Sequence, residues 1–207
     1  TLLWPLAKPL LGQAPPPQIL YTMSRQQWQD AGWQQLPSLR NEWWRNRQVG
    51  QSPLNLQLLG TVDWLDAQLT GQGWRRVTPP ALSGLGRWLA PAAALRDLPV
   101  LPHLHDGRYE SHAWVLDRST DRLLLRLWPA PAAIDDGSPP LWLGEISQQV
   151  LRERLRWLRF AVTTDTPGVA LDHLLGPLPL PAAARLVQRP AAPERSAGDA
   201  TGTRLLL

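Results

Sequence analysis

Two alternating runs in the middle of the chain constrain its fold more than any other feature. Residues 109–117 (YESHAWVLD) alternate, a short polar turn follows, and residues 121–128 (DRLLLRLW) alternate back. Alternation with a period of two is typical of a half-buried β-strand, and a turn between two such runs predicts an antiparallel hairpin. We centre the predicted pairing on Ser119, which sets the residue that stands opposite each position.

That register assigns side chains to the two faces of the hairpin. Leu123, Leu125 and Leu127 share one fully apolar face, which we predict to be the core face. The expected cross-strand pairs are His112 with Arg126, Trp114 with Leu124, and Glu110 with Trp128. The opposite face then carries Glu110, His112 and Arg126, which we interpret as candidate ligand-binding residues.

Two related strand-helix units precede the hairpin. The first has a strand at 19–21, a helix at 24–31, a Gly32-Trp33 stop and a short strand in QQLP; the second has a strand at 56–59, a helix at 61–71, a Gly73-Trp74 stop and a short strand in RRVTPP. Ser24 and Thr61 are natural N-caps, and glycine is favoured just past a helix end.

The remaining segments add short helices and strands. We predict helices at 80–95 and 167–175, and strands at 141–146, 153–163, 184–188 and 203–207. The 22 prolines argue against long helices and favour turns and edge strands. The predicted fold is therefore α+β, a mainly antiparallel sheet with short helices on one face and two related strand-helix units near the N-terminus.

The proline run at 15–17 predicts the domain organisation. Consecutive prolines form an extended, semi-rigid segment, so we interpret residues 1–18 as an apolar arm and Pro-rich linker. Residues 19–207 are expected to form a single α+β domain. Because the sequence begins at Thr1 and not at Met, we expect a piece of a longer protein, whose opening residues suit either the exit from a membrane span or an arm packed on the domain.

Composition excludes several kinds of site. The chain has no cysteine, which excludes disulfides, zinc-thiolate sites and thiol catalysis. It contains no apolar run of about 18 residues, no G-x-S-x-G elbow and no phosphate-binding P-loop. The net charge of +4 is small and no nucleic-acid-binding module is recognisable, so we expect no nucleic-acid partner.

Residues 43–47 (WWRNR) are the most unusual short run in the chain. Tryptophan and arginine together suit a membrane-water interface, where an aromatic ring lies at headgroup level and a cation meets anionic lipid. We therefore take Trp43, Trp44, Arg45 and Arg47 as candidate membrane-interface residues. The alternative is a surface loop whose tryptophans fold back over the core.

His103, His105 and His112 are the metal-like cluster of this chain, with Asp106 and Glu110 nearby. A His-x-His pair on a strand places both imidazoles on one face, and His112 would approach from the hairpin. This pattern predicts a metal site and, with it, a metal-dependent hydrolase as the alternative function. The simpler interpretation is one buried histidine hydrogen-bonded near Glu110 and two exposed ones, with no cofactor.

Arg154 and Arg156 share one face of the predicted strand at 153–163. The planar guanidinium fork matches phosphate, so both are candidate ligand-binding residues for a phosphate-bearing headgroup. Charged side chains along an edge strand also prevent aggregation, which explains the same pattern without a ligand.

Four stretches, in this order, resemble the LssY C-terminal domain family: QSPLNLQLLGTVDWLDAQLTGQGW, LPHLHDGRYESHAWVLDRSTDRLLLRLW, PPLWLGEIS and TGTRLLL. The resemblance covers roughly residues 36–207. It implies the soluble tail of a bacterial inner-membrane protein whose membrane portion carries a DedA-type module, a PAP2-type lipid phosphatase module, or both. It also implies a His- and Asp/Arg-rich stretch after the long strand, where this chain has TTDTPGVALDHLL instead.

From these observations we expect a non-catalytic, membrane-tethered accessory or ligand-binding domain linked to lipid-phosphate chemistry. The resemblance implies that any phosphatase residues lie in the membrane portion, so we assign no catalytic residue here. The expected partners are the membrane portion of the same protein and anionic lipid or phosphate headgroups. The expected location is the bacterial inner membrane, with this domain on the periplasmic side.

Overall fold

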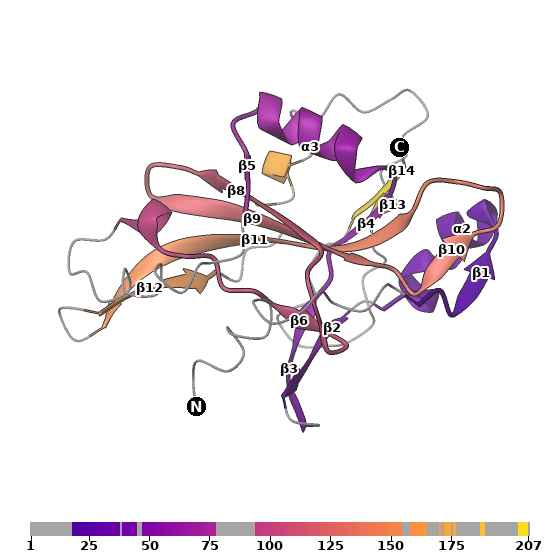
Figure 1. The fold of residues 1–207 in the computed structure, drawn as a ribbon, viewed down its shortest axis with the longest axis horizontal. Helices are drawn as coiled ribbons and strands as arrows, with labels where there is room; N and C mark the ends of the chain where they lie inside the picture. The colour runs from indigo at the N-terminus through magenta and orange to yellow at the C-terminus, as the bar shows by residue number, and fades with distance from the viewer. Residues whose placement is uncertain are drawn as a thin grey trace.

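The computed structural model describes residues 18–37, 39–44, 47–77, 94–154, 158–164, 170, 172–174, 176, 187–188 and 203–206. Within them the chain is an α+β fold dominated by antiparallel strands, as predicted (Figure 1). The helices are α2 (Arg25–Gln35), α3 (Val62–Gly71) and the short 3-10 helix η2 (Leu95–Asp97). The strands are β1 (Tyr21–Met23), β2 (Leu39–Trp44), β3 (Arg47–Pro53), β4 (Leu56–Leu59), β5 (Arg75–Arg76), β6 (Leu104–His105), β7 (Arg108–Tyr109), β8 (His112–Asp117), β9 (Asp121–Pro129), β10 (Ala132–Ile134), β11 (Leu141–Arg154), β12 (Leu158–Thr163), β13 (Val187–Gln188) and β14 (Thr203–Leu206).

The main sheet has β11 at its centre. In the described part of the chain its order is β13-β14-β4-β11-β9-β8-β5, and β12 pairs with β11 as well. Most neighbours are antiparallel, whereas β14 runs parallel to β4. The predicted closing strand at 203–207 is therefore confirmed, and it lies beside a strand far away in sequence.

The predicted hairpin is confirmed as β8 and β9, but its predicted register is wrong by one residue. His112 pairs with Leu127 and Trp114 with Leu125, whereas Arg126 stands opposite Ala113. Because side chains alternate between faces, a slip of one residue transfers a whole strand to the other face. His112 therefore lies on the leucine face of the sheet, and it is separated from Arg126.

The predicted strand at 153–163 is also wrong in its extent. β11 continues from Leu141 to Arg154, and β12 begins only at Leu158, which pairs back with Arg154. Arg154 and Leu158 therefore belong to two different strands. The sequence predicts one continuous strand here because arginines and apolar residues alternate through 152–159, with no local signal for a turn.

One edge of β11 is shared between two short partners. Residues 141–144 pair with β4, and residues 149–154 pair with β12. Between them, the Asn55 side chain accepts a hydrogen bond from the Ile146 backbone N–H at 2.8 Å and donates to the Ile146 carbonyl at 2.9 Å. A buried side-chain amide thus satisfies backbone groups that no strand reaches.

The face of the main sheet that packs against α3 is here called the α3 face. Leu123, Leu125 and Leu127 lie in its core, which confirms the predicted core face. The core also contains Leu65 and Leu69 of α3. In Figure 1, α3 lies above the central strands of the sheet.

Glycine ends α3 as predicted. Gly73 has a φ of +86°, and its N–H and that of Trp74 donate to the carbonyls of Thr70 and Leu69. This is the Schellman arrangement, which needs a left-handed residue just past the helix. Thr61 is the N-cap residue of α3, but its side chain makes no capping hydrogen bond.

The other helix packs on the opposite face of the sheet, so the helices divide between both faces instead of sharing one. Trp28 of α2 lies in a core cluster with Trp128 and Leu143, which stand opposite each other on β9 and β11. The Trp28 indole N–H donates to the Gln57 side chain on β4 at 2.9 Å. Figure 1 places α2, β1 and β10 together at one end of the molecule.

The N-cap of α2 is confirmed, but its predicted stop is wrong. Ser24 and Gln27 exchange reciprocal hydrogen bonds in a capping box. The helix passes Gly32 and ends at Gln35, so the predicted strand in QQLP does not form. Gly32 is held within the helix because its carbonyl accepts from the Leu36 N–H and from the Gln57 side chain.

Two small hairpins lie outside the main sheet. β2 and β3 form one, with a register irregularity between Glu42 and Trp43, and β6 and β7 form the other. Figure 1 shows β2 and β3 extending away from the main sheet, with β6 beside β2. No described helix is long and apolar enough to cross a membrane.

Several predicted elements lie partly or wholly outside the described residues. The predicted helix at 80–95 falls mostly within 78–93 and is not described. Of the predicted helix at 167–175, residues 170 and 172–174 are helical. Of the predicted strand at 184–188, Val187 and Gln188 form β13.

Candidate functional site

Residues 94–111 cross the face of the sheet opposite α3, and we call them the strap. Two buried arginines of β9 hold the strap through its carbonyls. Arg122 donates to the carbonyls of Leu95 and Leu98 at 3.1 and 2.8 Å, and Arg126 donates to the carbonyl of Leu101 at 3.1 Å. In Figure 1 this segment runs beneath the central strands from η2 to β6. These cations thus bind backbone acceptors of the strap and tie it to β9.

Arg122 keeps its charge in this position. Burial is the main cause that lowers its pKa to about 10; Asp117 opposes this shift, and the positive charges of Arg126 and Arg75 add to it. The side chain also donates to Gln149 on β11 at 2.8 Å. At neutral pH it is therefore a cation that fastens the strap.

A buried ionic cluster lies under the strap around Arg126. Its guanidinium lies 3.5 Å from Glu110 and 3.9 Å from Glu145, and all three side chains are at most 9% exposed. Glu110 accepts the His103 backbone N–H at 2.7 Å, and the His103 ring lies 3.4 Å from Glu145. Glu110 and Arg126, predicted on one face, do come together, but they link the strap to the sheet.

The three histidines of the predicted metal site do not converge. His105 is buried in β6, with its ring edge-on to Trp128 at 6.1 Å between centroids and 3.7 Å from Asp106. His103 and His105 belong to the strap, whereas His112 lies on the α3 face, because the register inverts its side. Among the described residues no group of three or more His, Asp or Glu side chains is placed to hold a metal ion.

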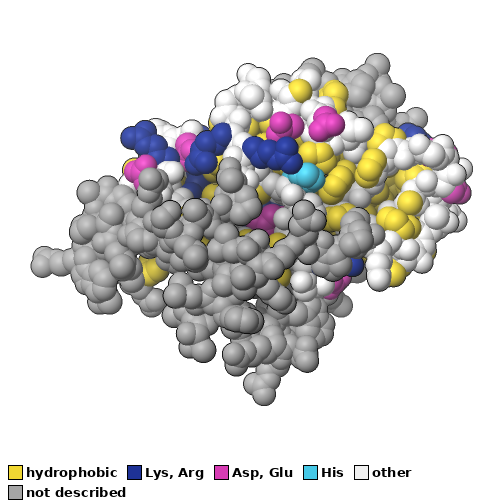
Figure 2. Space-filling view, in the orientation of Figure 1, with side chains coloured by type: hydrophobic (Ala, Val, Ile, Leu, Met, Phe, Trp, Pro, Cys, Tyr) yellow, Lys and Arg dark blue, Asp and Glu magenta, His cyan; other side chains and the backbone are white. Residues whose placement is uncertain are grey.

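His112 lies instead in an aromatic setting at the edge of the α3 face. Its ring stacks on Trp114 at 5.9 Å between centroids and meets Trp142 edge-on at 5.3 Å. Trp114 donates its indole N–H to Asp66 of α3 at 2.5 Å, which holds the platform in place. Figure 2 shows a histidine at the surface with basic side chains beside it and apolar side chains nearby.

Arg76 of β5 completes this arrangement. Its guanidinium donates to His112 Nδ1 at 2.6 Å and lies 5.9 Å from the centre of the Trp114 ring, within cation-π range. Arginine has donors only, so Nδ1 is the acceptor and the ring proton of neutral His112 lies on Nε2. Burial lowers the pKa of His112, and so does the Arg76 charge, whereas Asp66 and Asp63 raise it.

A comparison with known protein families identifies the family of this chain. A family model described as LssY C-terminus matches residues 33–167, a span that includes the hairpin, α3 and β11. The chain belongs to this family. No curated protein and no solved structure matches it.

In this LssY C-terminus domain, the structure describes some of the other predicted site residues but not all of them. Trp43 and Trp44 end β2 and pair with Gln48 and Arg47 of β3, so they stand at the closed end of the hairpin. Arg154 is the last residue of β11. Arg45 and Arg156 lie outside the described residues.

Sequence reasoning missed three residues that organise the two faces of the LssY C-terminus domain. The missed residues are Arg122, Glu145 and Arg76. Arg122 lies four residues before the predicted Arg126 in DRLLLRLW, and charges spaced evenly on one side of an apolar strand signal a buried ionic face. Glu145, inside LWLGEIS, carries the same signal. Arg76 has no local signal, because only the pairing of β5 with β8 brings it to His112.

Proposed function

We propose that this chain is a non-catalytic accessory domain, tethered to the bacterial inner membrane beside lipid-phosphate chemistry of the PAP2 or DedA type. Its partners are the membrane portion of the same protein and anionic lipid headgroups. The periplasmic side is the proposed location. The family membership supports this context, and the position of one hairpin carries the proposal.

That observation is the register of β2 and β3. Trp43 pairs with Gln48 and Trp44 with Arg47, so two tryptophans and an arginine stand at the closed end of a hairpin that extends from the sheet. Tryptophan is enriched at membrane-water interfaces, and each Arg near an anionic surface contributes about 1 kcal/mol. A projecting end with both residue types suits contact with a bilayer surface.

The arrangement of the buried charges supports a non-catalytic role. Arg122, Arg126 and Glu145 lie under the strap and Glu110 belongs to it, and the contacts among these charged residues join the strap to the sheet. A group that is committed to a structural partner is poorly placed to transfer protons to a substrate. No observation favours the alternative of a metal-dependent hydrolase, since His112 lies on the other face from His103 and His105.

Vesicle flotation tests the membrane role. We expect the chain to float with vesicles rich in phosphatidylglycerol, and the double variant Trp43→Ala/Trp44→Ala to bind them at least about tenfold more weakly because its aromatic anchors are gone. Arg45→Gln/Arg47→Gln removes about 2 kcal/mol, or about thirtyfold, on these vesicles only. Trp64→Ala, on α3, is the matched control.

Unchanged flotation of Trp43→Ala/Trp44→Ala would refute the membrane role of the hairpin. Circular dichroism and urea unfolding of each variant establish that the fold is intact. A phosphate-release assay with lipid phosphates tests the non-catalytic part separately. Turnover by this chain that survives flotation-defective variants would show an enzyme and not an accessory domain.

A further inference from the structure

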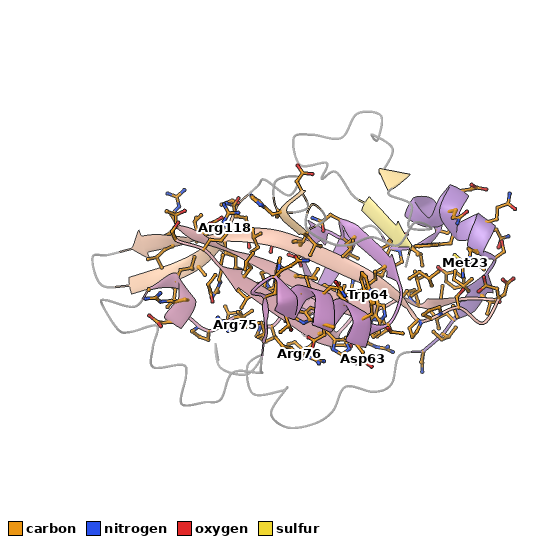
Figure 3. All side chains as sticks on the ribbon, turned by 90° about the horizontal axis from the view of Figure 1, so that it is seen from above. Met23, Asp63, Trp64, Arg75, Arg76 and Arg118 are labelled. Carbon is orange, nitrogen blue, oxygen red and sulfur yellow. The ribbon has the colours of Figure 1, made fainter. Side chains whose placement is uncertain are left out.

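Arg76 and Arg75 are neighbours in β5 with opposite surroundings. Arg75 pairs with Val115 and faces the strap side, where it donates to Asp117 at 3.0 Å. Arg76 pairs with Trp114 and faces α3, where its contacts are the His112 ring and the Trp114 ring. Within the described part of the chain, Arg76 is a cation at the surface without a carboxylate partner. Figure 3 labels Arg75 and Arg76 together with Asp63 and Trp64 of α3.

The Arg76 guanidinium is held in place by contacts that use little of its hydrogen-bonding capacity. One N–H is donated to His112, and the cation lies over the Trp114 ring. The remaining N–H groups of an arginine form a planar fork that matches the oxygens of a carboxylate or a phosphate. An arginine that is fixed in position and still has N–H groups to donate is suited to bind an oxyanion.

His112 is the second element of this arrangement. Its ring is oriented by Trp114 and Trp142, and neutral Nδ1 accepts from Arg76. On protonation this nitrogen becomes a donor, and it then repels Arg76 unless an acceptor comes between them. The two side chains are therefore arranged so that an added oxyanion replaces their mutual hydrogen bond.

We propose that Arg76 and His112 bind a singly charged oxyanion that inserts between them and accepts a hydrogen bond from each. The Arg76–His112 bond breaks, His112 Nδ1 takes up one proton from solvent, and both residues donate to the ligand. Phosphodiesters and carboxylates share this chemistry. The site is independent of the membrane-binding hairpin.

The surrounding charges select a single negative charge on the ligand. The charged groups around His112 are Arg76 on β5, and Asp66 and Asp63 on α3. Both carboxylates lie close enough to act on the imidazole, so a second charge on the ligand would be repelled. Trp64 and Trp142 are half-buried on the same side of the sheet, and they offer apolar surface to a substituent of the ligand.

Nuclear magnetic resonance with small-molecule probes tests this site. The probes are diphenyl phosphate and benzoate (singly charged, with an apolar ring), dimethyl phosphate (singly charged, without a ring) and phenyl phosphate, a dianion above pH about 7. The signals of the His112 ring and the Trp142 indole report binding. We expect both ring-bearing monoanions to shift these signals and to bind more tightly than dimethyl phosphate or phenyl phosphate. The ratio of their affinities identifies which oxyanion class the site prefers.

Matched variants distinguish binding at Arg76 from a general effect of positive charge at this edge of the sheet. Arg76→Gln should weaken diphenyl phosphate binding about tenfold or more, the loss expected for a charge-assisted hydrogen bond. Arg75→Gln should change it less than about twofold, because that side chain faces the other side. Arg76→Lys keeps the charge without the fork, so it should bind with intermediate affinity, and it also serves if Arg76→Gln does not fold.

The pH dependence of probe affinity is an independent test, because the proposed binding takes up a proton. Affinity of the wild-type chain should rise as the pH falls from about 8 to about 6, and His112→Gln should abolish that dependence. Three results would each overturn the proposal. They are equal losses in Arg75→Gln and Arg76→Gln, tighter binding of phenyl phosphate than of diphenyl phosphate, and a wild-type affinity that does not change with pH. Trp43→Ala/Trp44→Ala should leave probe binding unchanged, so failure of the membrane proposal and failure of this one are distinguishable.

Discussion

Arg126 on β9 stands directly opposite Glu145 on β11, and both side chains are buried beneath the strap. The guanidinium also lies 3.5 Å from Glu110 and donates to the Leu101 carbonyl, so one cation serves two carboxylates and a backbone acceptor. This arrangement makes the strap part of the folded core and explains why these charges are retained inside the protein.

Replacing Arg126 by Met should therefore be severely destabilising. The substitution leaves two buried carboxylates without their cation, a loss of about 3–5 kcal/mol in the free energy of unfolding. Urea unfolding at neutral pH measures it. Arg75→Gln is the control, since its pair with Asp117 is exposed and is expected to contribute at most about 1 kcal/mol. Equal losses in the two variants would mean that Arg126 is not the anchor of the strap.

Gly144 should not tolerate a side chain, whereas Gly71 should. A Cβ at Gly144 would lie 2.9 Å from Leu56 Cβ and 3.0 Å from Leu127 Cδ2, where β4, β11 and β9 meet. Gly144→Ala should cost about 1–3 kcal/mol through overpacking. Nothing lies within 4 Å of a Cβ at Gly71 in the last turn of α3, so Gly71→Ala should be neutral or stabilise by up to about 1 kcal/mol. Thermal unfolding of both variants tests the pair, and comparable melting temperatures would contradict it.

The two helix N-caps should differ in their contribution to stability. Ser24 exchanges hydrogen bonds with Gln27, whereas the Thr61 side chain makes no capping bond. Ser24→Ala should lower the free energy of unfolding by about 1 kcal/mol, and Thr61→Ala by much less. Chemical denaturation distinguishes them. A larger loss for Thr61→Ala would show that its hydroxyl caps α3 in solution.

His112 should make the fold less stable in acid. Its pKa is lowered on folding from the ordinary value of 6.5, first by burial and then by Arg76. The unfolded chain therefore binds the proton more readily, so the stability contribution of neutral His112 is present above pH 6.5 and is lost as the pH falls below it. Urea unfolding across this range should show the loss in the wild type and a weaker dependence in His112→Gln.

Arg76 provides a direct check on the cause of that shift. Removing its charge in Arg76→Gln should raise the pKa of His112, while Arg75→Gln should have a smaller effect. Titration of the His112 ring signals measures both. At high pH the nitrogen shifts of the ring should identify the Nε2–H form, since Nδ1 accepts from Arg76; the opposite tautomer would contradict the observed hydrogen bond.

Local patterns predicted much of the fold. The alternation in DRLLLRLW indicated β9 and its leucine core face, Ser24 indicated the start of α2, and Gly73 indicated the end of α3. Gly32 resembles Gly73 in sequence, yet it lies inside a helix because Gln57 and Leu36 bind its carbonyl. The same local signal therefore has two outcomes, because only Gly32 receives a hydrogen bond from a distant strand, through Gln57 of β4.

The candidate site was less predictable than the fold. The hairpin itself was predicted correctly, but its first strand begins at His112, so Glu110 belongs to the strap, where it meets Arg126. The one-residue difference in register moved His112 to the α3 face. Alternation specifies which residues share a face within one strand. It does not specify how two strands align, which depends on the packing of the whole sheet.

The sequence by itself determined the α+β class, the apolar faces of the strands, the family and the exclusion of cysteine chemistry, because composition and periodicity are properties of the chain alone. Only the tertiary structure decided the partners of Arg126, the division of the helices between two faces and the meeting of Arg76 with His112. These contacts join residues that lie far apart in sequence. Their geometry follows from strand register and core packing, which leave no periodic signal in the residues concerned.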